Sequence, residues 1–428
     1  MKIERKSVTL QQKYAEMKKL LIFVCCLTTF AACHHHDDDC ETTVADRTVL
    51  IYMAGENNLN NAKSNLDFIK PDLEQMREGT KTMAANNHLL VYVDGADSKQ
   101  KPYLLELANG LTVDSVAMEE DTRTSDPETL LNVMRQAMSK CPANEYALVL
   151  WGHASGWLIE KDSVASGVWT TPKPAPRKAY GLDTGNNSAG NSGTWMNMPS
   201  MARALSMLPK LKFIFADCCH FQCAETAYEL RDVTDYIIAS PAEIPGEGAP
   251  YHTVVPALFE KDTFWQSIVD KYYAQVLHNG YEELYVPLSV VKTSEMQALA
   301  QATRTVLNSF APDLESPYPD MTGLIHYYYH GASHKFYDMN DFILRYASAD
   351  AYTAWKLALD RAVIYKKMAT RWMTNVNWGF NYNDFTVTEE KYGGISMFVP
   401  QWYYQNTVNE SIKKLGWYYA AGYANVEW

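Results

Sequence analysis

The sequence lacks three features that would define other classes of protein. After residue 32 it has no run of about 18 apolar residues, which is the length that a membrane-spanning helix needs. It has no excess of positive charge, because 38 Lys and Arg stand against 50 Asp and Glu and give a net charge of −12. Such an acidic chain repels phosphate backbones, so we expect no nucleic-acid partner. It also has no glycine-rich motif that would cradle a phosphate.

Apolar residues are abundant instead. They make up 47% of the 428 residues, and aromatic residues make up 12%. This is enough for a large buried core, and it argues against a disordered chain or a coiled coil. The length allows two or three domains, or one large α/β domain with an extension.

The first 32 residues have the composition of a secretion signal. Met17-Lys-Lys precedes a short apolar run, Leu20–Ala32, and Cys33 follows that run. A basic start, a short apolar stretch and small residues before the cut are typical of such signals. Phe30-Ala-Ala-Cys33 resembles a bacterial lipoprotein box, in which the cysteine carries the lipid. We predict a signal region over residues 1–32 that starts at Met17, with lipidation at Cys33. The alternative is an ordinary signal peptide with an incidental cysteine.

Residues 33–46 form the predicted lipidated tether. They include His34-His-His-Asp-Asp-Asp39, which is either a metal-binding tract or, more simply, a solvated spacer. An acidic stretch directly after the lipidated cysteine resembles the surface-export signal of Bacteroides-like lipoproteins. We expect a secreted protein that a lipid anchors to the bacterial outer membrane, where the export signal would expose it on the cell surface. This anchor would be its only contact with a membrane.

The remaining cysteines do not form a disulfide pattern. Five are left once the signal and Cys33 are set aside, and they are Cys40, Cys141, Cys218, Cys219 and Cys223. An odd number without regular spacing does not indicate a disulfide scaffold. The three that lie between residues 218 and 223 also lack the second pair of ligands that a zinc site needs. A free thiol in a secreted protein therefore needs another reason.

Short β-rich runs alternate with helical patterns in the first half of the chain. The runs predicted as buried strands are residues 47–54, 88–93, 146–151, 211–216 and 236–240. Helices are predicted to begin at Asp126-Pro127 and to span residues 199–208. Strands that alternate with helices form mainly parallel sheets with helices on both faces. The predicted fold class is therefore α/β, with a mainly parallel central sheet.

Two segments depart from this alternation. Residues 158–195 are rich in Pro, Gly and Asn and are predicted to form a long exposed loop, of a kind that is usually functional or mobile. The sequence pattern of residues 256–428 predicts mostly helices. Their apolar-periodic stretches lie near 262–278, 295–310, 351–372 and 404–420, and two more strands are expected at 284–291 and 394–399. We predict a main domain over residues 47–255 and a C-terminal subdomain over 256–428 that packs on it.

Two reactive side chains directly follow predicted strands. His153 follows the strand that ends at Trp151, and Cys219 follows the strand that ends at Ala216. In open α/β sheets, residues just past the carboxyl ends of strands line the ligand crevice. If the strands are neighbours, the imidazole and the thiol can meet, and a nearby His favours the nucleophilic thiolate. A helix predicted over residues 221–231 would favour it further. Either residue alone is more often structural, but their joint placement favours a catalytic pair.

The residues around this pair resemble the clostripain family of cysteine peptidases. Trp151-Gly-His-Ala-Ser-Gly-Trp157 is similar to the family block W-G-H-G-S-G-W. Asp217-Cys-Cys-His-Phe-Gln-Cys-Ala-Glu225 matches the block D-A-C-L-M-x-x-x-E at its first, third and ninth positions. Weaker similarity extends over about residues 47–401. The resemblance implies a caspase-like α/β/α sandwich, with residues 47–255 as the catalytic domain and a mostly helical C-terminal part.

The same resemblance implies a Cys–His dyad. His153 would be the general base or acid, and Cys219 the nucleophile that forms an acyl-enzyme after Arg or Lys. Asp217 matches the acid at the floor of the family's specificity pocket, where it would pair with the basic side chain of the substrate. The backbone N–H groups of Cys219 and Ala154 would hold the oxyanion. Ala154 replaces a family glycine, and its Cβ would misaim that donor if the loop needed a positive φ.

The resemblance also implies how the enzyme is activated. It would be an endopeptidase that cuts itself between about residues 160 and 180. The basic residues near that segment are Lys161, Lys173, Arg177 and Lys178. The predicted chemistry requires no cofactor and no metal, and a calcium requirement stays open. We expect a monomer whose partners are protein or peptide substrates that contain Arg or Lys. The alternative function is a catalytically weak or inactive surface binding protein on the same scaffold, which Ala154 and the aromatic run Tyr327-Tyr-Tyr329 motivate.

Overall fold

The computed structural model describes most of the chain after the predicted tether. The described residues are 44–61, 66–96, 100–159, 179–185, 193–275, 277–278, 283–310, 318–327, 334–374, 379–380, 385–404 and 408–426. They belong to one unit that begins at Val44. The signal region and Cys33 lie outside the described residues, as do the basic residues of the predicted self-cleavage segment.

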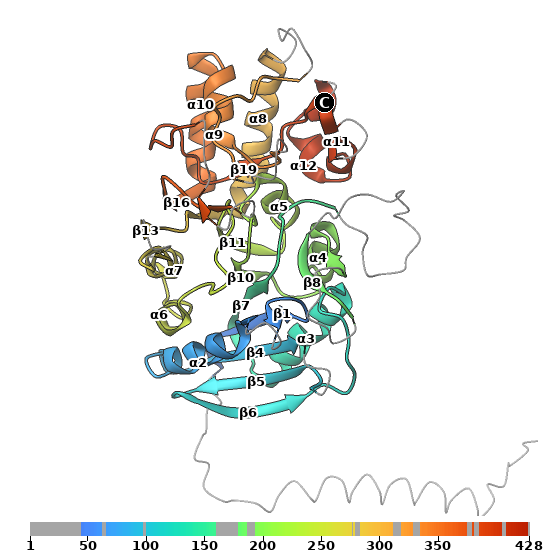
Figure 1. Ribbon diagram of the computed structural model, residues 1–428, viewed down its shortest axis with the longest axis vertical. Coiled ribbons are helices and arrows are strands. Elements are labelled where there is room, and N and C mark those ends of the chain that lie inside the picture. The colour runs from blue at the N-terminus through green and yellow to red at the C-terminus, as the bar shows by residue number, and fades with distance from the viewer. Residues whose placement is uncertain are drawn as a thin grey trace, which may run out of the picture. The chain divides into compact units, whose positions relative to one another are not determined.

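A nine-stranded sheet lies at the centre of the fold (Figure 1). Its strand order is β16-β14-β11-β10-β7-β1-β4-β5-β6. The inner strands run parallel to one another, and they are β11 (Thr234–Ala239), β10 (Leu211–Asp217), β7 (Ala143–Gly152), β1 (Ala45–Gly55) and β4 (Asn87–Gly95). These strands contain the five runs predicted from the sequence almost entirely, so the α/β fold with a largely parallel sheet is confirmed.

Antiparallel strands extend the sheet at both edges and make it a mixed sheet. On one side they are β5 (Tyr103–Ala108) and β6 (Leu111–Ala117), and on the other β14 (Leu288–Lys292) and β16 (Val363–Lys367). Every residue of β6 is exposed, so its sequence carries no buried face that could reveal a strand. β16 continues directly from α10 (Ala349–Ala362), so the helical pattern predicted over 351–372 is wrong from residue 363 onward.

Helices cover both faces of the sheet because successive strand residues point to opposite sides. In β1, residues 50, 52 and 54 belong to one hydrophobic core, whereas residues 49, 51 and 53 belong to the other. The first core includes α3 (Pro127–Lys140), α4 (Met198–Leu205), α5 (Ala224–Glu229) and α8 (Met296–Phe310). The second includes α2 (Ile69–Thr80), α6 (Tyr251–Ala257) and α7 (Phe264–Tyr273). Strands buried on both faces are continuously apolar, which is why the sequence revealed them.

The start of α3 follows the sequence prediction. The Asp126 side chain accepts a hydrogen bond of 3.0 Å from the Glu128 N–H, and Pro127 occupies the first turn.

The predicted boundary between residues 255 and 256 lies within α6, and β14 and β16 of the C-terminal part join the same sheet. Among the described residues, none of the helices has the length and apolar character to cross a membrane.

The other elements of the described residues are short or lie in the C-terminal part. The helices are α9 (Met339–Tyr346), α11 (Val408–Ile412), α12 (Gly416–Ala420), η2 (Thr293–Glu295), η4 (Trp402–Tyr404) and η5 (Tyr423–Asn425). The strands are β2 (Asn60–Asn61), β3 (Leu66–Asp67), β8 (Tyr180–Asp183), β9 (Thr194–Met196), β12 (Leu277–His278), β13 (Glu283–Leu284), β15 (Tyr337–Asp338), β17 (Met373–Thr374), β18 (Gly379–Phe380) and β19 (Ser396–Met397). β8 and β9 pair with each other inside the segment predicted as a loop over 158–195.

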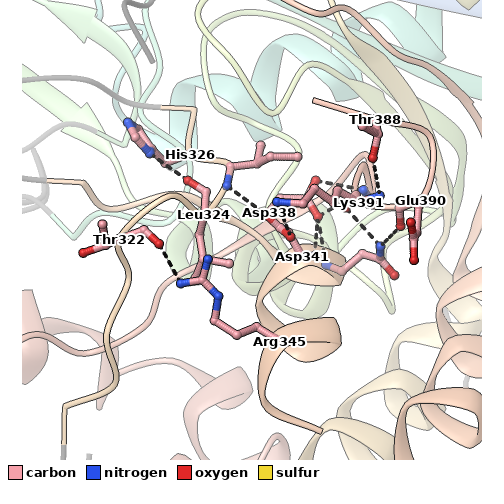
Figure 2. Close-up of polar contacts among 12 residues, drawn as sticks. Thr322, Leu324, His326, Asp338, Asp341, Arg345, Thr388, Glu390 and Lys391 are labelled. Carbon is pink, nitrogen blue, oxygen red and sulfur yellow. Dashed lines mark hydrogen bonds and ion pairs between the residues drawn. The ribbon is translucent and has the colours of Figure 1, made fainter. Parts of the chain in front are cut away.

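Asp338 organises the C-terminal part around the start of α9 (Figure 2). Its carboxylate accepts hydrogen bonds of 2.9 and 3.1 Å from the N–H groups of Asn340 and Asp341. It also accepts two bonds, of 3.0 and 2.8 Å, from the Gly393 N–H. The neighbouring Asp341 pairs with Lys391 Nζ at 3.4 Å. These contacts bind the segment around residues 391–393 to α9, just before that segment continues into β19.

Candidate active site

The two reactive residues predicted from the sequence follow adjacent strands. β7 and β10 pair in parallel, and the register places Asp217 opposite Trp151. His153 and Cys219 each lie two residues beyond this pair, at the carboxyl-terminal edge of the sheet. The condition that the sequence left open, that their strands be neighbours, is therefore met.

A strained turn carries the chain from β7 to His153. Gly152 has φ of +139°, and a Cβ there would lie 2.8 Å from the Ala54 carbonyl oxygen, so only glycine fits this turn. The His153 carbonyl then accepts a hydrogen bond of 2.8 Å from the Gly181 N–H, and the Ser155 N–H donates to the Ala179 carbonyl at 2.8 Å. Residues 179–181 of the 158–195 segment therefore lie beside His153.

Asn58 orients the His153 ring. The ring Nε2 lies 2.8 Å from Asn58 Oδ1, and Asn58 follows β1, the other neighbour of β7. An amide oxygen only accepts hydrogen bonds, so the ring donates through Nε2. In the neutral ring, Nδ1 is then the nitrogen that can accept a proton.

Ala154 does not adopt the conformation that raised concern in the sequence. The non-glycine residues with positive φ in the described part of the chain are Asn86, Asn109 and His220. Ala154 instead forms an antiparallel bridge with Tyr180. The ladder bonds of this bridge are made by the residues on either side of Ala154, so its own N–H is not used by the ladder. The Cβ of Ala154 therefore imposes no backbone strain.

Cys219 differs from its neighbouring thiols in burial. It is half-buried, whereas Cys218 and Cys223 are buried and both are free thiols. Burial raises the pKa of the Cys218 thiol and of the Cys223 thiol far above the ordinary value, so neither forms a thiolate at neutral pH. The Ile244 N–H points at Cys219 Sγ from 3.5 Å, which is a donor that a thiolate can accept.

The helix predicted over residues 221–231 is shorter than predicted and starts later, so Cys219 is not in its first turn. α5 begins at Ala224, and residues 220–222 are not helical. His220 turns the chain instead, with φ of +55°, a left-handed conformation that is uncommon outside glycine. Its buried ring stacks on Phe336 at 4.9 Å between centroids, and its Nδ1 lies 3.2 Å from the Pro241 carbonyl oxygen. These contacts hold the turn that directs Cys219.

The C-terminal part braces the segment that follows Cys219. The Ser396 N–H of β19 donates to the Gln222 carbonyl at 3.1 Å, and the Phe398 N–H donates to Glu225 Oε1 at 2.7 Å. Gln222 Nε2 in turn donates to the Ser289 carbonyl of β14 at 2.8 Å. Burial raises the pKa of Glu225 to about 8. Residues beyond 256 thus hold the backbone next to the candidate nucleophile.

Asp217 is a buried carboxylate with three donors. The Tyr272 hydroxyl donates to Oδ1 at 3.0 Å, and the Tyr251 hydroxyl and the Ala249 N–H donate to Oδ2 at 2.8 and 3.0 Å. Burial raises the pKa of Asp217 and these hydrogen bonds oppose the rise. Gly248, with φ of +60°, lets this turn approach, because a Cβ there would lie 2.6 Å from Oδ2.

A second buried carboxylate lies near Asp217. Asp72 of α2 accepts a hydrogen bond of 2.7 Å from Trp151 Nε1. Burial, and then the charge of Asp217, raise the pKa of Asp72 to about 8, with a smaller contribution from Glu247. A cationic side chain that enters this region would favour the charged form of these carboxyl groups.

Sequence reasoning missed several of these residues. Asn58 and Tyr251 lie within the weaker similarity to the clostripain family that extends over about residues 47–401. That similarity was therefore an available signal for both residues. Asp72 and Tyr272 carried no signal, because each is one polar position on an amphipathic helix. Only the packing of α2 and α7 on the sheet buries them beside Asp217.

Comparison with known proteins gives the family. The chain matches the clostripain family, Peptidase_C11, over residues 51–428. It is similar to a secreted C11 cysteine protease from Bacteroides thetaiotaomicron solved with an irreversible peptide inhibitor, with a TM-score of 0.72, 29% identity, and coverage of 89% of this chain and 100% of that one. An inactive zymogen C11 protease from Parabacteroides distasonis gives 0.68 and 29%, with coverage of 89% and 99%.

A third structure, the secreted C11 protease called iotapain from Bacteroides thetaiotaomicron, has a TM-score of 0.65 and covers 89% of this chain and 99% of that one. At 21% identity it supports the fold alone. The comparison with curated proteins found no match. The family match spans both strand ends described above, and the chain therefore belongs to the clostripain family and is a cysteine peptidase.

Proposed function

We propose that the protein is an endopeptidase that cleaves after Arg or Lys, with Cys219 as nucleophile and His153 as general base and acid. The observation that carries this proposal is the parallel pairing of β7 with β10, which brings the two residues to one edge of the sheet. The half-buried state of Cys219, beside two deeply buried thiols, supports it as the attacking sulfur.

The reaction would follow the course of other thiol peptidases. His153 takes the proton of the Cys219 thiol, and the sulfur attacks the substrate carbonyl carbon. The imidazolium then gives its proton to the leaving amine, and the peptide bond breaks to leave a thioester. Water, deprotonated by His153, hydrolyses that thioester and restores the thiol. Asn58 would keep the ring in position throughout.

Two groups would stabilise the substrate. The Ala154 N–H and the Cys219 N–H are the proposed donors to the oxyanion, and the strand pairing of Ala154 leaves its N–H out of the ladder. Asp217 would accept the basic side chain, and the bound cation would favour ionisation of the neighbouring Asp72, whose pKa burial and the charge of Asp217 raise to about 8. A buried carboxylate pairs well with a guanidinium or an ammonium group.

The location of the protein is also proposed from the sequence. The relative with the peptide inhibitor is described as secreted. Secretion of this chain, with a lipid at Cys33 and attachment to the outer membrane, would match the signal-like residues 1–32. We propose no required cofactor for the thiol chemistry itself, and protein or peptide substrates as its partners.

A matched set of fluorogenic peptides tests the proposed specificity. Peptides that differ only in a final Arg, Lys or citrulline should separate charge from shape, because citrulline is neutral and close to Arg in size. We expect release from the Arg or Lys peptides. For the citrulline peptide, we expect kcat/KM to be lower by at least about 10²-fold. Absence of release from all three, after deliberate cleavage between residues 160 and 180, would favour the binding protein instead.

Self-cleavage is the second expected result. Purified protein should appear as two fragments split between about residues 160 and 180, because that segment joins the His153 edge to β8 and carries basic residues. Denaturing gels and intact mass measure the split. The Cys219→Ala protein should stay whole, whereas Cys141→Ala, which removes a buried thiol outside the site, should split normally. An identical split in Cys219→Ala would refute self-cleavage.

A further inference from the structure

Three side chains of different chemical type meet on the sheet face that α3 covers. They are His88 of β4, Glu106 of β5 and Cys141, which directly follows α3, and one ligand atom from each lies within 4.8 Å of the others. β4 and β5 pair with each other near the β6 edge of the sheet (Figure 1). His88 lies near the amino-terminal end of β4, so the group is at the opposite end of the strands from His153 and Cys219.

The alternation of the two strands directs these side chains to one point. Leu90 and Leu104 belong to the core that α3 shares with the sheet. His88 lies two residues before Leu90, and Glu106 lies two residues after Leu104, so both side chains are on that same face. Cys141 ends α3 and is buried in the same core. The group therefore combines an imidazole, a carboxylate and a thiol from three separate elements.

One oxygen of Glu106 is shared by the other two members of the group. Its Oε1 lies 3.0 Å from His88 Nδ1 and 3.7 Å from Cys141 Sγ. Its Oε2 lies 3.3 Å from Lys140 Nζ, which also pairs with Asp114. The lysine thus holds the carboxylate through one oxygen, while the other oxygen faces the imidazole and the thiol. Outer contacts of this kind orient the ligands of metal sites.

We propose that His88 Nδ1, Glu106 Oε1 and Cys141 Sγ bind a zinc ion. Zinc takes nitrogen, oxygen and sulfur ligands at about 2.0–2.3 Å, so in a tetrahedral site the ligand atoms lie about 3.3–3.7 Å apart. The observed separations of 3.0 and 3.7 Å need a change of only a few tenths of an ångström. Binding takes the proton from the thiol and releases it to the solvent, and the imidazole binds in its neutral form.

Charge and access also favour zinc. The Cys141 thiolate and the Glu106 carboxylate supply two negative charges, which balance the ion, while Lys140 is balanced by Asp114. The His88 side chain is 38% exposed, so the ion has a route from the solvent and a water molecule can take the fourth position. Calcium and magnesium fit poorly because they prefer oxygen ligands.

The ion would link β4 and β5 to the end of α3, from which the chain enters β7. Its expected role is structural, because the group lies at the end of the strands opposite the candidate active site. The inference is therefore independent of the proposed function, and its test does not use peptidase activity.

Zinc binding by the intact chain tests the site. The background protein carries Cys219→Ala, which keeps zinc off the proposed nucleophile, and has Ala at positions 34–36, because the histidine tract there could bind zinc itself. It is freed of metal with EDTA, dialysed, kept reduced, titrated with ZnCl2 and melted with and without zinc. We expect one ion bound through Cys141 and a melting temperature raised by about 3 °C or more, since a ligand of the folded state stabilises it. Absence of binding and of a shift at micromolar zinc would leave only a hydrogen-bonded cluster and overturn the proposal.

Variants on this background locate the ion. Cys141→Ser should abolish the binding and the shift, whereas Cys218→Ala, which removes another buried thiol, should bind as the background does. If Cys141→Ser fails to fold, the half-buried His88→Ala decides, with an expected loss of affinity of about 10²-fold or more. His252→Ala, which removes an exposed imidazole outside the group, is its control. Unchanged affinity in the folded Cys141→Ser or in His88→Ala would overturn the assignment.

Cobalt gives a spectroscopic signature of the sulfur ligand. Co²⁺ accepts the same ligand types as zinc, and a thiolate bound to it absorbs strongly in the near ultraviolet through charge transfer. We expect this band in the background protein and in Cys218→Ala, its loss when zinc is added, and its absence from Cys141→Ser. A band that persists in Cys141→Ser would place the metal on another thiol and contradict the proposed site.

Discussion

Cys219→Ala is expected to lower kcat/KM for an Arg-ending peptide by about 10⁴-fold or more. The proposed acyl-enzyme needs a sulfur at this position, and no other thiol among the described residues can replace it. Cys218 and Cys223 are deeply buried, and burial raises the pKa of both thiols far above neutral pH. What remains after the substitution would be the contribution of substrate positioning and the oxyanion donors.

Steady-state kinetics on purified protein measures this loss, with circular dichroism to verify that the variant folds. Cys218→Ala is the matched control. It removes the adjacent thiol and installs the residue that the family block carries, so we expect activity within a few-fold of the parent. If Cys218→Ala were inactive and Cys219→Ala active, the assignment of the two cysteines would have to be exchanged.

Asp217→Asn should have the second largest effect. We expect kcat/KM for an Arg peptide to fall by about 10²-fold or more, because the substitution leaves a cationic side chain without its buried counter-charge. The value for the citrulline peptide should change far less, so the preference for Arg over citrulline should collapse. An unchanged preference would remove Asp217 from the specificity site.

The surroundings of Asp217 call for a structural control. The Asn amide presents one oxygen and one donor NH2, whereas the native carboxylate accepts from the Ala249 N–H and from two tyrosine hydroxyls. Some stability will therefore be lost along with the charge. Tyr272→Phe removes one of these donors and keeps the carboxylate. It should lower the melting temperature but preserve most of the preference for Arg, which separates charge from packing.

The inner sheet could be predicted because both of its faces are buried. A strand that is covered on two sides must be apolar throughout, and β1, β4, β7, β10 and β11 show this as short apolar runs. The edge strands are different. β6 is exposed along its whole length, and β16 has only its first residue buried, so local sequence carries no pattern that distinguishes them.

The candidate site divides in the same way. His153, Asp217 and Cys219 lie within a few residues of a strand end, so the sequence itself places them at the edge of the sheet. Asn58, Asp72 and Tyr272 reach the site from other elements, far away in the chain. A helix with one acidic position looks the same in sequence whether that position faces water or a second buried carboxylate.

The sequence by itself determined which strands are buried, that a thiol and an imidazole follow two of them, and which family pattern surrounds the pair. Only the tertiary structure decided that β7 and β10 are neighbours in register, and that His220 rather than a helix turns the chain at Cys219. Local patterns report what each residue needs from its surroundings. Long-range pairing and packing decide which distant residues supply it.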